Sequence, residues 1–168
     1  MSTQKFSTNA LHAGHDVKAN GGTRAVPIYQ STSFVFEDAD HAADLFSLAK
    51  PGYIYTRLNN PTNDILEQRL AALEGGIAAV VTASGMAAIS TIIFGLLQKG
   101  DHLVLSKEIY GGTHHFISSE LSRMGIEYTF TEDTGVDSFE RAIQPNSKMI
   151  YLESPSNPLL KLTDIRAV

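Results

Sequence analysis

The sequence contains no cysteine. This absence excludes disulfide bonds, thiolate metal sites and a cysteine nucleophile together. The chain also has no excess of positive charge, because 13 Lys and Arg residues stand against 18 Asp and Glu, a formal net charge of −5. Proteins that bind nucleic acid need a basic face, so we expect no nucleic-acid partner. The six histidines lack a third ligand at metal-binding spacing, so we expect no metal site.

The chain has little that resembles a targeting or membrane segment. Its first thirty residues are polar, with no charged start followed by an apolar stretch, so no secretory signal is expected. Residues 77–98 carry no charge and reach the length of a membrane span, but Thr82, Ser84 and Gly85 interrupt them. A buried parallel strand followed by a buried helix gives the same pattern. We therefore expect a cytoplasmic protein that does not contact membranes.

What the sequence does contain is typical of a globular α/β protein. Hydrophobic residues make up 43% of the 168 and charged residues 18%, which fits about one domain. From Gly75 onward, apolar runs alternate with helical segments, which indicates βαβ units and a parallel sheet. We expect strands at 77–82, 102–105, 126–131 and 148–152, and helices at 86–97, 113–124 and 137–143, with a further helix that has barely begun at 163–168.

The first seventy residues differ in kind. Their polar, glycine-bearing start indicates an arm, and an irregular arm ahead of an α/β core is a common way to reach a neighbouring subunit. A helix with Pro at its first position and an apolar stripe ends the region at a Gly pair. We expect an arm at 1–24, an extended segment at 26–36, a short helix at 38–48 capped by Asp38, a loop at 51–60 and the longer helix at 61–74.

The loops that follow the expected strands are candidates for a ligand site, because parallel α/β sheets bind ligands at the carboxyl ends of their strands. The first loop, Thr82-Ala83-Ser84-Gly85-Met86, opens a helix, whose free N–H groups and dipole favour a phosphate. It matches neither the dinucleotide fingerprint nor the P-loop motif. The pattern is therefore compatible with a phosphate seat and also with a plain tight turn.

Two further loops present an aromatic ring, a carboxylate and an amide at the same edge. Tyr110 stands beside Gly111 and Gly112, where its ring could lie flat on a planar cofactor or be half buried. Glu153 and Asn157 stand in a loop stiffened by two prolines. Three such loops at one edge favour a ligand site more strongly than any one of them.

Other residues carry weaker signals. Arg57, near Tyr55, suits phosphate recognition, although a lone Arg in a loop is usually solvated. The His12/His15 and His114/His115 pairs are interpreted as structural. Lys161 follows the proline-rich loop, but nothing around it suggests an activated amine, so we do not interpret it as a nucleophile.

Six motifs, taken in order and spacing, resemble a known family over nearly the whole chain. They are TRAVPIYQSTSFVF, GYIYTRLNNPT, LEQRLAALEGG, TASGMAAI, EIYGGT and IYLESPSNP. They resemble the N-terminal portion of the pyridoxal-phosphate (PLP)-dependent transsulfuration enzymes of Cys/Met metabolism. That family includes cystathionine γ-synthase, cystathionine γ-lyase, methionine γ-lyase and O-acetylhomoserine sulfhydrylase. The first motif and the segment LFSLAKPGYIYTR are most similar to the O-acetylhomoserine sulfhydrylases.

The resemblance implies a fold and an assembly. The fold would be the three-layer α/β large domain of a PLP-dependent transferase of fold type I, aspartate-aminotransferase-like, here incomplete and with an extended N-terminal arm. Residues 1–60 would be the arm and inter-subunit segment, and residues 61–168 the first part of the PLP-binding domain, truncated at its C-terminus. The full-length family implies a homo-oligomer, a dimer of dimers.

The resemblance also implies pyridoxal 5'-phosphate as cofactor and assigns roles to particular residues. The N–H groups of Gly85 and Met86 would hold the phosphate. Tyr110 would stack on the pyridine ring and assist proton transfer. Asn157 would lie near the ring hydroxyl, with Glu153 as a supporting residue of the same motif. Tyr55 and Arg57 would reach the phosphate of the neighbouring subunit's cofactor.

The implied reaction is γ-replacement on O-acetyl-L-homoserine with sulfide or a thiol, which gives homocysteine for methionine and cysteine biosynthesis. Cystathionine γ-synthase activity and methionine or cystathionine γ-lyase activity remain alternatives. An alternative of another class is a non-catalytic truncated remnant that only assembles with full-length subunits. A third is a nucleotide-binding α/β domain that uses the Ser84-Gly85 turn.

The sequence departs from the family in what it lacks. Family members need a Schiff-base Lys and an Asp paired with the pyridinium nitrogen, and both lie beyond the point where this sequence stops. No Lys here stands in the Schiff-base motif, so we do not expect the 168-residue chain to be active alone. In the family's sheet the first strand is separated from the next three by strands that come later in the sequence, so we also expect a gap in the sheet.

Overall fold

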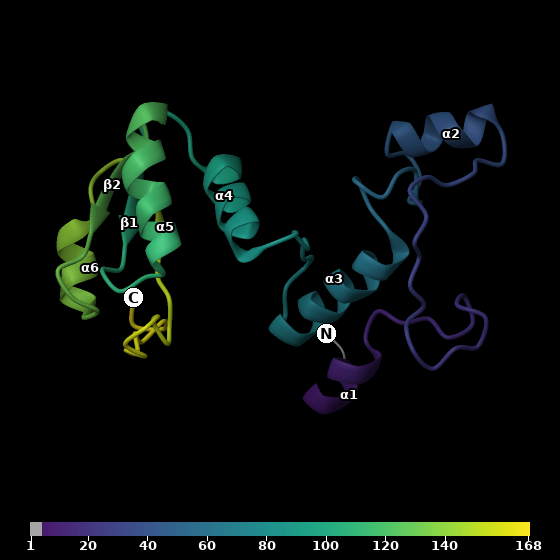
Figure 1. Ribbon diagram of the computed structural model, residues 1–168, viewed down its shortest axis with the longest axis horizontal. Helices are drawn as coiled ribbons and strands as arrows, with labels where there is room; N and C mark the ends of the chain where they lie inside the picture. The colour runs from purple at the N-terminus through teal and green to yellow at the C-terminus, as the bar shows by residue number, and fades with distance from the viewer. Residues whose placement is uncertain (1–4) are drawn as a thin grey trace. The chain divides into compact units, whose positions relative to one another are not determined.

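A computed structural model describes residues 5–168, which divide after Val81 into two compact units. Figure 1 colours the chain from purple at the N-terminus to yellow at the C-terminus. The sequence-based boundary at residue 60 concerns the domains of a whole enzyme and stays a prediction.

The first unit contains three helices: α1 (Phe6–His12), α2 (Ala39–Phe46) and α3 (Pro61–Glu74). The prediction of α2 is confirmed, and its predicted cap Asp38 accepts the His41 backbone N–H at 2.7 Å. The prediction of α3 is confirmed with the same bounds, and the Asn60 side chain caps it by accepting the Thr62 N–H at 2.9 Å. Gly75 ends α3 at a φ of +69°, a conformation that glycine adopts without strain.

The arm over residues 1–24 stays a prediction, and residues 1–4 of it lie outside the described residues; within it Phe6–His12 form the helix α1, which the sequence did not predict. The segment FSTNALH is too polar to show a helical stripe, and α1 is stabilised instead by packing on α3. Arg69 of α3 donates through Nε to the Ala13 carbonyl at 3.0 Å, just past the end of α1. Gly14 then turns the chain at a φ of +76°. The helix therefore depends on tertiary contacts that lie far away in the sequence.

Residues 26–36 are extended as predicted and lie against the loop that precedes α3. Ser33 and Tyr55 form an isolated antiparallel bridge, flanked by hydrogen bonds from Phe34 N to Ile54 O (3.1 Å) and from Thr56 N to Thr32 O (2.8 Å). The predicted loop at 51–60 is confirmed as well. Backbone hydrogen bonds thus join the extended segment to the loop.

The second unit is built on a parallel sheet of three strands, β1 (His102–Leu105), β2 (Glu127–Phe130) and β3 (Ser147–Tyr151), in the order β2-β1-β3. Both pairings are parallel, which confirms the predicted sheet type and three of the four predicted strands. The helices are α4 (Gly85–Leu96), α5 (Gly111–Phe116) and α6 (Val136–Ala142). Beyond α5 the helical path continues through a π-helical turn (Ile117–Leu121) and a 3₁₀ turn (Ser122–Met124) to Gly125, whose φ is +72°.

Successive side chains of β1 point to opposite faces of the sheet, and each face is covered by helices. Leu103 and Leu105 pack into one cluster with Ile93 of α4 and with Ile117, whereas Val104 packs on the other face against Phe139 of α6. Figure 1 shows α5 and α6 on opposite sides of the strands. The unit therefore has the helix–sheet–helix layering that the sequence predicts.

The predicted strand at 77–82 is wrong, because this segment forms no ladder. Ile77 and Val80 are exposed, and the Val81 N–H donates to the Glu67 side chain at 2.8 Å instead of to a strand. A strand exists only through the hydrogen bonds of a neighbour, and no strand in residues 5–168 lies beside this one. The apolar, β-branched composition is therefore insufficient by itself.

The last residues form one turn rather than a full helix. The Val168 N–H donates to the Asp164 carbonyl at 3.2 Å, and the Asp164 side chain accepts the Arg166 N–H at 3.0 Å, as an N-cap residue does. Across the described part of the chain, no helix combines the length and the apolar composition that crossing a bilayer would require.

Candidate functional site

The start of α4 presents two backbone N–H groups that nothing in the helix uses. The Ser84 side chain accepts the Ala87 N–H at 3.1 Å, and the Ser84 carbonyl accepts the Ala88 N–H at 3.0 Å. Gly85 and Met86 stand at the first two helical positions, where N–H groups have no intrahelical partner. A Cβ atom at Gly85 would meet nothing within 4 Å, so the space beside it is open. This geometry fits a phosphate group, which the helix dipole would also favour.

Tyr110 stands directly before α5, at the carboxyl end of β1. The residue is 49% exposed, and its backbone N–H donates to Glu153 Oε2 at 2.9 Å. The ring lies across the helix start, where an added Cβ at Gly112 would approach its Cζ atom to 3.0 Å. Gly112 thus leaves the room that this ring position needs. A half-exposed ring held in this way offers a flat surface to a planar ligand.

Glu153 lies just beyond β3 and joins two elements of the site. While Oε2 accepts from Tyr110, Oε1 accepts the Tyr151 hydroxyl at 2.9 Å. Burial raises the pKa of Tyr151 to about 12, and the hydrogen bond to the Glu153 carboxylate adds to the rise, while a hydrogen bond with Thr113 opposes it. Thr113 is fully buried and its hydroxyl reaches Met86 Sδ at 3.8 Å.

Sequence reasoning missed Tyr151 and Thr113. A signal for Tyr151 was present, since residues two apart on a strand point to the same face and Tyr151 precedes Glu153 by two. Thr113 carries no comparable signal in the sequence, because its neighbours Met86 and Tyr151 come from α4 and β3. Two residues that were not predicted therefore contact the predicted ones: Tyr151 donates to Glu153, which also holds Tyr110, and Thr113 donates to Met86 Sδ and lowers the pKa of Tyr151.

Asn157 is exposed in the loop after β3, and its side-chain amide forms no hydrogen bond within residues 5–168. The neighbouring Ser156 is buried and anchors the loop, since its backbone N–H donates to the Lys161 carbonyl at 2.9 Å and its hydroxyl accepts the Lys161 N–H at 3.1 Å. The Lys161 ammonium is bound in turn to the Glu108 carboxylate at 2.6 Å. The loop is thus tied to the loop after β1, and Asn157 is free to bind a ligand.

Tyr55 and Arg57 belong to the first unit. The Arg57 guanidinium lies 5.6 Å from the centre of the Tyr55 ring, and both side chains are exposed. Thr56 between them is held by its backbone bond to Thr32 and by its hydroxyl, which donates to the Ser31 carbonyl. The segment therefore presents a cation and a phenol to solvent, and an exposed Arg can bind a phosphate through two of its N–H groups.

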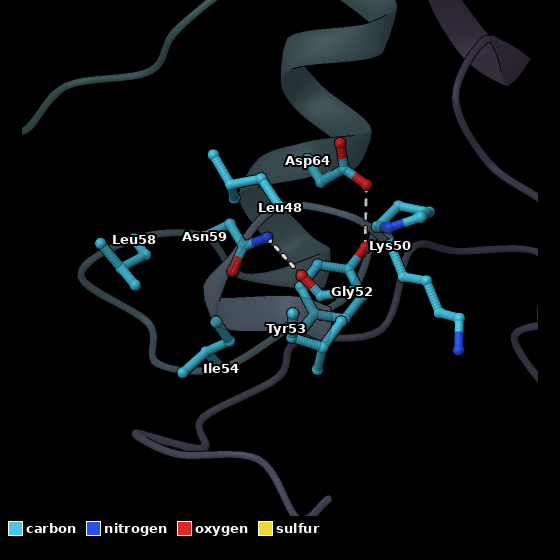
Figure 2. A pocket seen from close by; sticks show the side chains of 10 residues that line it. Leu48, Lys50, Gly52, Tyr53, Ile54, Leu58, Asn59 and Asp64 are labelled. Carbon is cyan, nitrogen blue, oxygen red and sulfur yellow. Dashed lines mark hydrogen bonds between the residues drawn. The ribbon is translucent and has the colours of Figure 1, made fainter. Parts of the chain in front are cut away.

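Ile54 and Leu58, on either side of this segment, line a pocket of about 610 Å³, which Figure 2 shows. In Figure 2 the Tyr53 hydroxyl donates to Asp64 at 2.8 Å, and the Asn59 amide donates to the Gly52 carbonyl at 2.8 Å. Burial and the hydrogen bond to the Asp64 carboxylate raise the pKa of Tyr53 to about 12. These bonds fix the loop from which Tyr55 and Arg57 project.

The second unit is thus an α/β domain that fits a small phosphorylated aromatic molecule at the carboxyl ends of its strands. Two N–H groups suit the phosphate, a ring suits an aromatic face, and an amide and a carboxylate lie on the loop beyond β3. Such an arrangement is what a PLP-binding domain of fold type I provides.

Comparison with known proteins identifies the family. Residues 7–168 match the model of the family described as Cys/Met metabolism PLP-dependent enzyme. The chain belongs to this family, so the resemblance stated from the motifs is confirmed, and the cofactor of the family is PLP.

Relatives with different activities have similar sequence identity to this chain. The chain is 45% identical over 170 residues to an L-methionine gamma-lyase of Fusobacterium nucleatum subsp. polymorphum, spanning 100% of this chain and 43% of that protein. It is 43% identical over 164 residues to an O-acetyl-L-homoserine sulfhydrylase of Leptospira meyeri, spanning 98% of this chain and 37% of that protein. The chain therefore spans about two fifths of the length of these relatives.

A solved structure supports both the fold and the cofactor. The crystal structure of a putative O-acetylhomoserine (thiol)-lyase of Campylobacter jejuni superposes with a TM-score of 0.88 at 42% identity, covering 96% of this chain and 40% of that one. That protein carries N'-pyridoxyl-lysine-5'-monophosphate. The predicted fold type I α/β domain, present in part, is confirmed.

Proposed function

We propose that this chain supplies the phosphate seat and the ring-stacking face of an enzyme that converts O-acetyl-L-homoserine and sulfide into homocysteine and acetate. The observation that carries the proposal is the connection of Met86, Tyr110 and Glu153 at one sheet edge. The sequence similarity to the O-acetyl-L-homoserine sulfhydrylase of Leptospira meyeri supports the choice of reaction.

Each predicted residue has a task that its position suits. The N–H groups of Gly85 and Met86 bind the phosphate, the Tyr110 ring covers one face of the pyridine, and the Tyr110 hydroxyl moves a proton at the substrate. The side-chain NH2 of Asn157 donates a hydrogen bond to the ring hydroxyl, while Glu153 orients the backbone of Tyr110. PLP, when bound, supplies the electron sink for γ-replacement.

Tyr55 and Arg57 act, in this proposal, on the phosphate of a neighbouring subunit's cofactor. Their exposure and the hydrogen bonds that fix Thr56 support this role. The enzyme would then be a homo-oligomer, a dimer of dimers, in the cytoplasm. The division into an arm over residues 1–60 and a PLP-binding part over residues 61–168 belongs to the same proposal.

A γ-lyase activity is the second candidate, and the 45% identity to an L-methionine gamma-lyase favours it. We do not expect either reaction from the 168-residue chain alone, because none of its lysines stands in the motif of the Schiff-base residue. A remnant that assembles with full-length subunits without adding turnover remains the alternative of another class.

A chimera tests the proposal. The matching N-terminal part of the Leptospira meyeri sulfhydrylase is replaced by this chain, and homocysteine formation from O-acetyl-L-homoserine and sulfide is measured beside the release of methanethiol from L-methionine. We expect the chimera to bind PLP and form homocysteine. A folded chimera that binds no PLP would contradict the site, and one that only cleaves methionine would favour the lyase.

The matched control separates the chain's contribution from that of the grafted remainder. Gly85→Asp places a carboxylate where the phosphate would bind, without filling a packed space. We expect this variant of the chimera to lose PLP while it stays folded. The 168-residue chain alone, assayed in parallel, should form no homocysteine.

A further inference from the structure

We propose that Tyr151 is a positioning residue for Tyr110 and acts on it through Glu153. The inference rests on the proposed function, since Tyr110 matters as the residue that stacks on the cofactor ring. Tyr151 touches neither cofactor nor substrate in this proposal. Its task is to fix the carboxylate that holds the backbone of Tyr110.

The first step is the bridging geometry of Glu153. One carboxylate oxygen accepts the Tyr110 N–H at 2.9 Å, and the other accepts the Tyr151 hydroxyl at 2.9 Å. Both oxygens are therefore used, and the carboxylate cannot rotate without breaking a bond. Hydrogen bonds to a charged acceptor are stronger than neutral ones, which makes this bridge a firm connection between β3 and the start of α5.

The second step is the anchoring of Tyr151 itself. Its ring packs against the core cluster that includes Leu103, Leu105 and Ile117, all fully buried. Such an anchor has few alternative positions, because the interior of a protein is close-packed. The hydroxyl of Tyr151 consequently presents a nearly fixed donor to Glu153.

The third step extends the connection to the phosphate seat. Thr113, fully buried in α5, is near enough to the Tyr151 hydroxyl to lower the pKa of Tyr151, and its own hydroxyl donates to Met86 Sδ at 3.8 Å. Met86 stands at the second position of α4, where its N–H is available for a phosphate. Tyr151 therefore lies between the residue proposed to hold the phosphate and the residue proposed to cover the ring.

The fourth step concerns the freedom of the Tyr110 ring. The ring is half exposed, and on its protein side it lies against Gly112, which leaves just enough room. With so little side-chain packing, the backbone position of Tyr110 largely decides where the ring lies. Loss of the Glu153 bond would allow that backbone to shift, and the stacking surface would shift with it.

The test compares Tyr151→Phe with the unaltered chain in two measurements. The first is hydrogen exchange of the Tyr110 amide, followed by NMR, with the Val104 amide in the central strand as internal reference. We expect exchange at Tyr110 to become about tenfold faster, as for the loss of one hydrogen bond to a charged group, and exchange at Val104 to stay unchanged.

The second measurement is affinity for pyridoxine 5'-phosphate, which lacks the aldehyde and therefore forms no covalent adduct with surface lysines. We expect its dissociation constant to rise about fivefold in Tyr151→Phe, the effect of a misplaced stacking ring. The dissociation constant of inorganic phosphate should not change, because the contact between Thr113 and Met86 at the start of α4 does not involve the Tyr151 hydroxyl.

Tyr128→Phe is the matched control. Tyr128 packs against the same core cluster from β2, and its hydroxyl forms no hydrogen bond within residues 5–168. Removing that hydroxyl should leave both measurements unchanged. Equal effects of the two substitutions would overturn the proposal, because they would show a general loss of packing.

The remaining outcomes also decide the question. If Tyr151→Phe does not fold, Glu153→Gln gives a second test, because an amide can keep the two contacts only as weaker, neutral hydrogen bonds, and faster exchange at Tyr110 is again expected. Unchanged Tyr110 exchange in a folded variant would overturn the proposal. If the unaltered chain binds no pyridoxine 5'-phosphate, the proposed function fails, while the exchange measurement still decides whether Tyr151 positions Tyr110.

Discussion

The two units of this chain are stabilised in different ways. In the second unit a three-stranded sheet buries a continuous cluster that includes Leu103, Leu105 and Ile117. In the first unit, within the described residues, Leu45 and Ile65 are the buried hydrophobic side chains. There, hydrogen bonds across long sequence distances, such as Arg69 to Ala13, take the place of a core. The difference suits the proposed tasks, because a rigid sheet edge can position a cofactor ring.

The largest expected effect tests the core of the second unit. Leu105→Ala removes a fully buried side chain from the central strand and should lower the free energy of unfolding by about 3 kcal/mol. Urea denaturation, followed by the near-ultraviolet signal of the tyrosines, measures the change. Leu45→Ala in the first unit is the control. If it destabilised the second unit as much as Leu105→Ala, the two units would not be independently stabilised.

In the first unit we expect the largest loss of stability from a substitution in a turn, not from one in a hydrophobic core. Gly14 has a φ of +76°, and a Cβ atom there would lie 2.7 Å from the Ile65 carbonyl oxygen of α3. We expect Gly14→Ala to cost about 2–3 kcal/mol, because backbone strain and a backbone clash add together. Thermal unfolding followed by circular dichroism measures this cost.

Gly21→Ala provides the control for that substitution. Gly21 also has a positive φ, +65°, but an added Cβ would meet nothing within 4 Å. This variant should therefore show the strain alone, about 1 kcal/mol. Equal losses at Gly14 and Gly21 would mean that contact between the Gly14 turn and α3 adds nothing, and the comparison between the units would lose its main support.

Helix caps should give smaller and similar effects in both units, because they act locally. Ser84 caps α4 and Asp38 caps α2 through one side-chain bond each. Replacement of either by Ala should cost about 1 kcal/mol, measured as a shift in the urea midpoint. A loss confined to one unit would show that the other helix is held entirely by tertiary contacts.

The two units also differ in how well the sequence predicts them. Helix α3 follows from Pro61, an apolar stripe and Gly75, and β1 from a short apolar run between turns. These elements carry their own signals. Helix α1 carries none, since its polar sequence is stabilised by α3, which lies far along the chain. Sequence patterns therefore predict the elements that are stabilised by their own residues, and they miss elements such as α1 that depend on distant contacts.

The strand predicted at 77–82 shows the opposite error. Its composition suits a strand, but pairing is a property of two segments, and Ile77 finds no partner in the described chain. For the candidate site, the loops around Tyr110 and Glu153 could be placed from the ends of β1 and β3, whereas Gly85 could be placed only as the start of a helix, because no strand precedes it in the described part of the chain. The Tyr151 and Thr113 contacts could not, because they depend on how β3, α4 and α5 pack.

The smallest expected effect concerns pH and separates the units once more. His102, fully buried at the start of β1, links the three strands: Nδ1 lies 2.7 Å from Ser147 Oγ, and Nε2 lies 2.9 Å from Thr129 Oγ1. The Gln144 amide nitrogen, 3.2 Å from Nε2, can only donate, so Nε2 accepts and Nδ1 carries the proton. A second proton has no place in this network.

Burial accordingly lowers the pKa of His102 below its ordinary value of 6.5, although the charge of Glu127 acts in the opposite direction. The unfolded chain then takes up a proton at a higher pH than the folded one. The contribution of His102 to stability is complete above about pH 6.5 and is lost as pH falls toward the lowered pKa of the folded state. Urea midpoints of the second unit, measured from pH 7.5 downward, should fall below pH 6.5, and His102→Asn should flatten that slope. If the urea midpoint of His102→Asn fell with pH as steeply as that of the unaltered chain, the pH dependence would come from carboxylates elsewhere. The hydrogen bonds of His102 across the three strands would then not contribute to the stability of this unit.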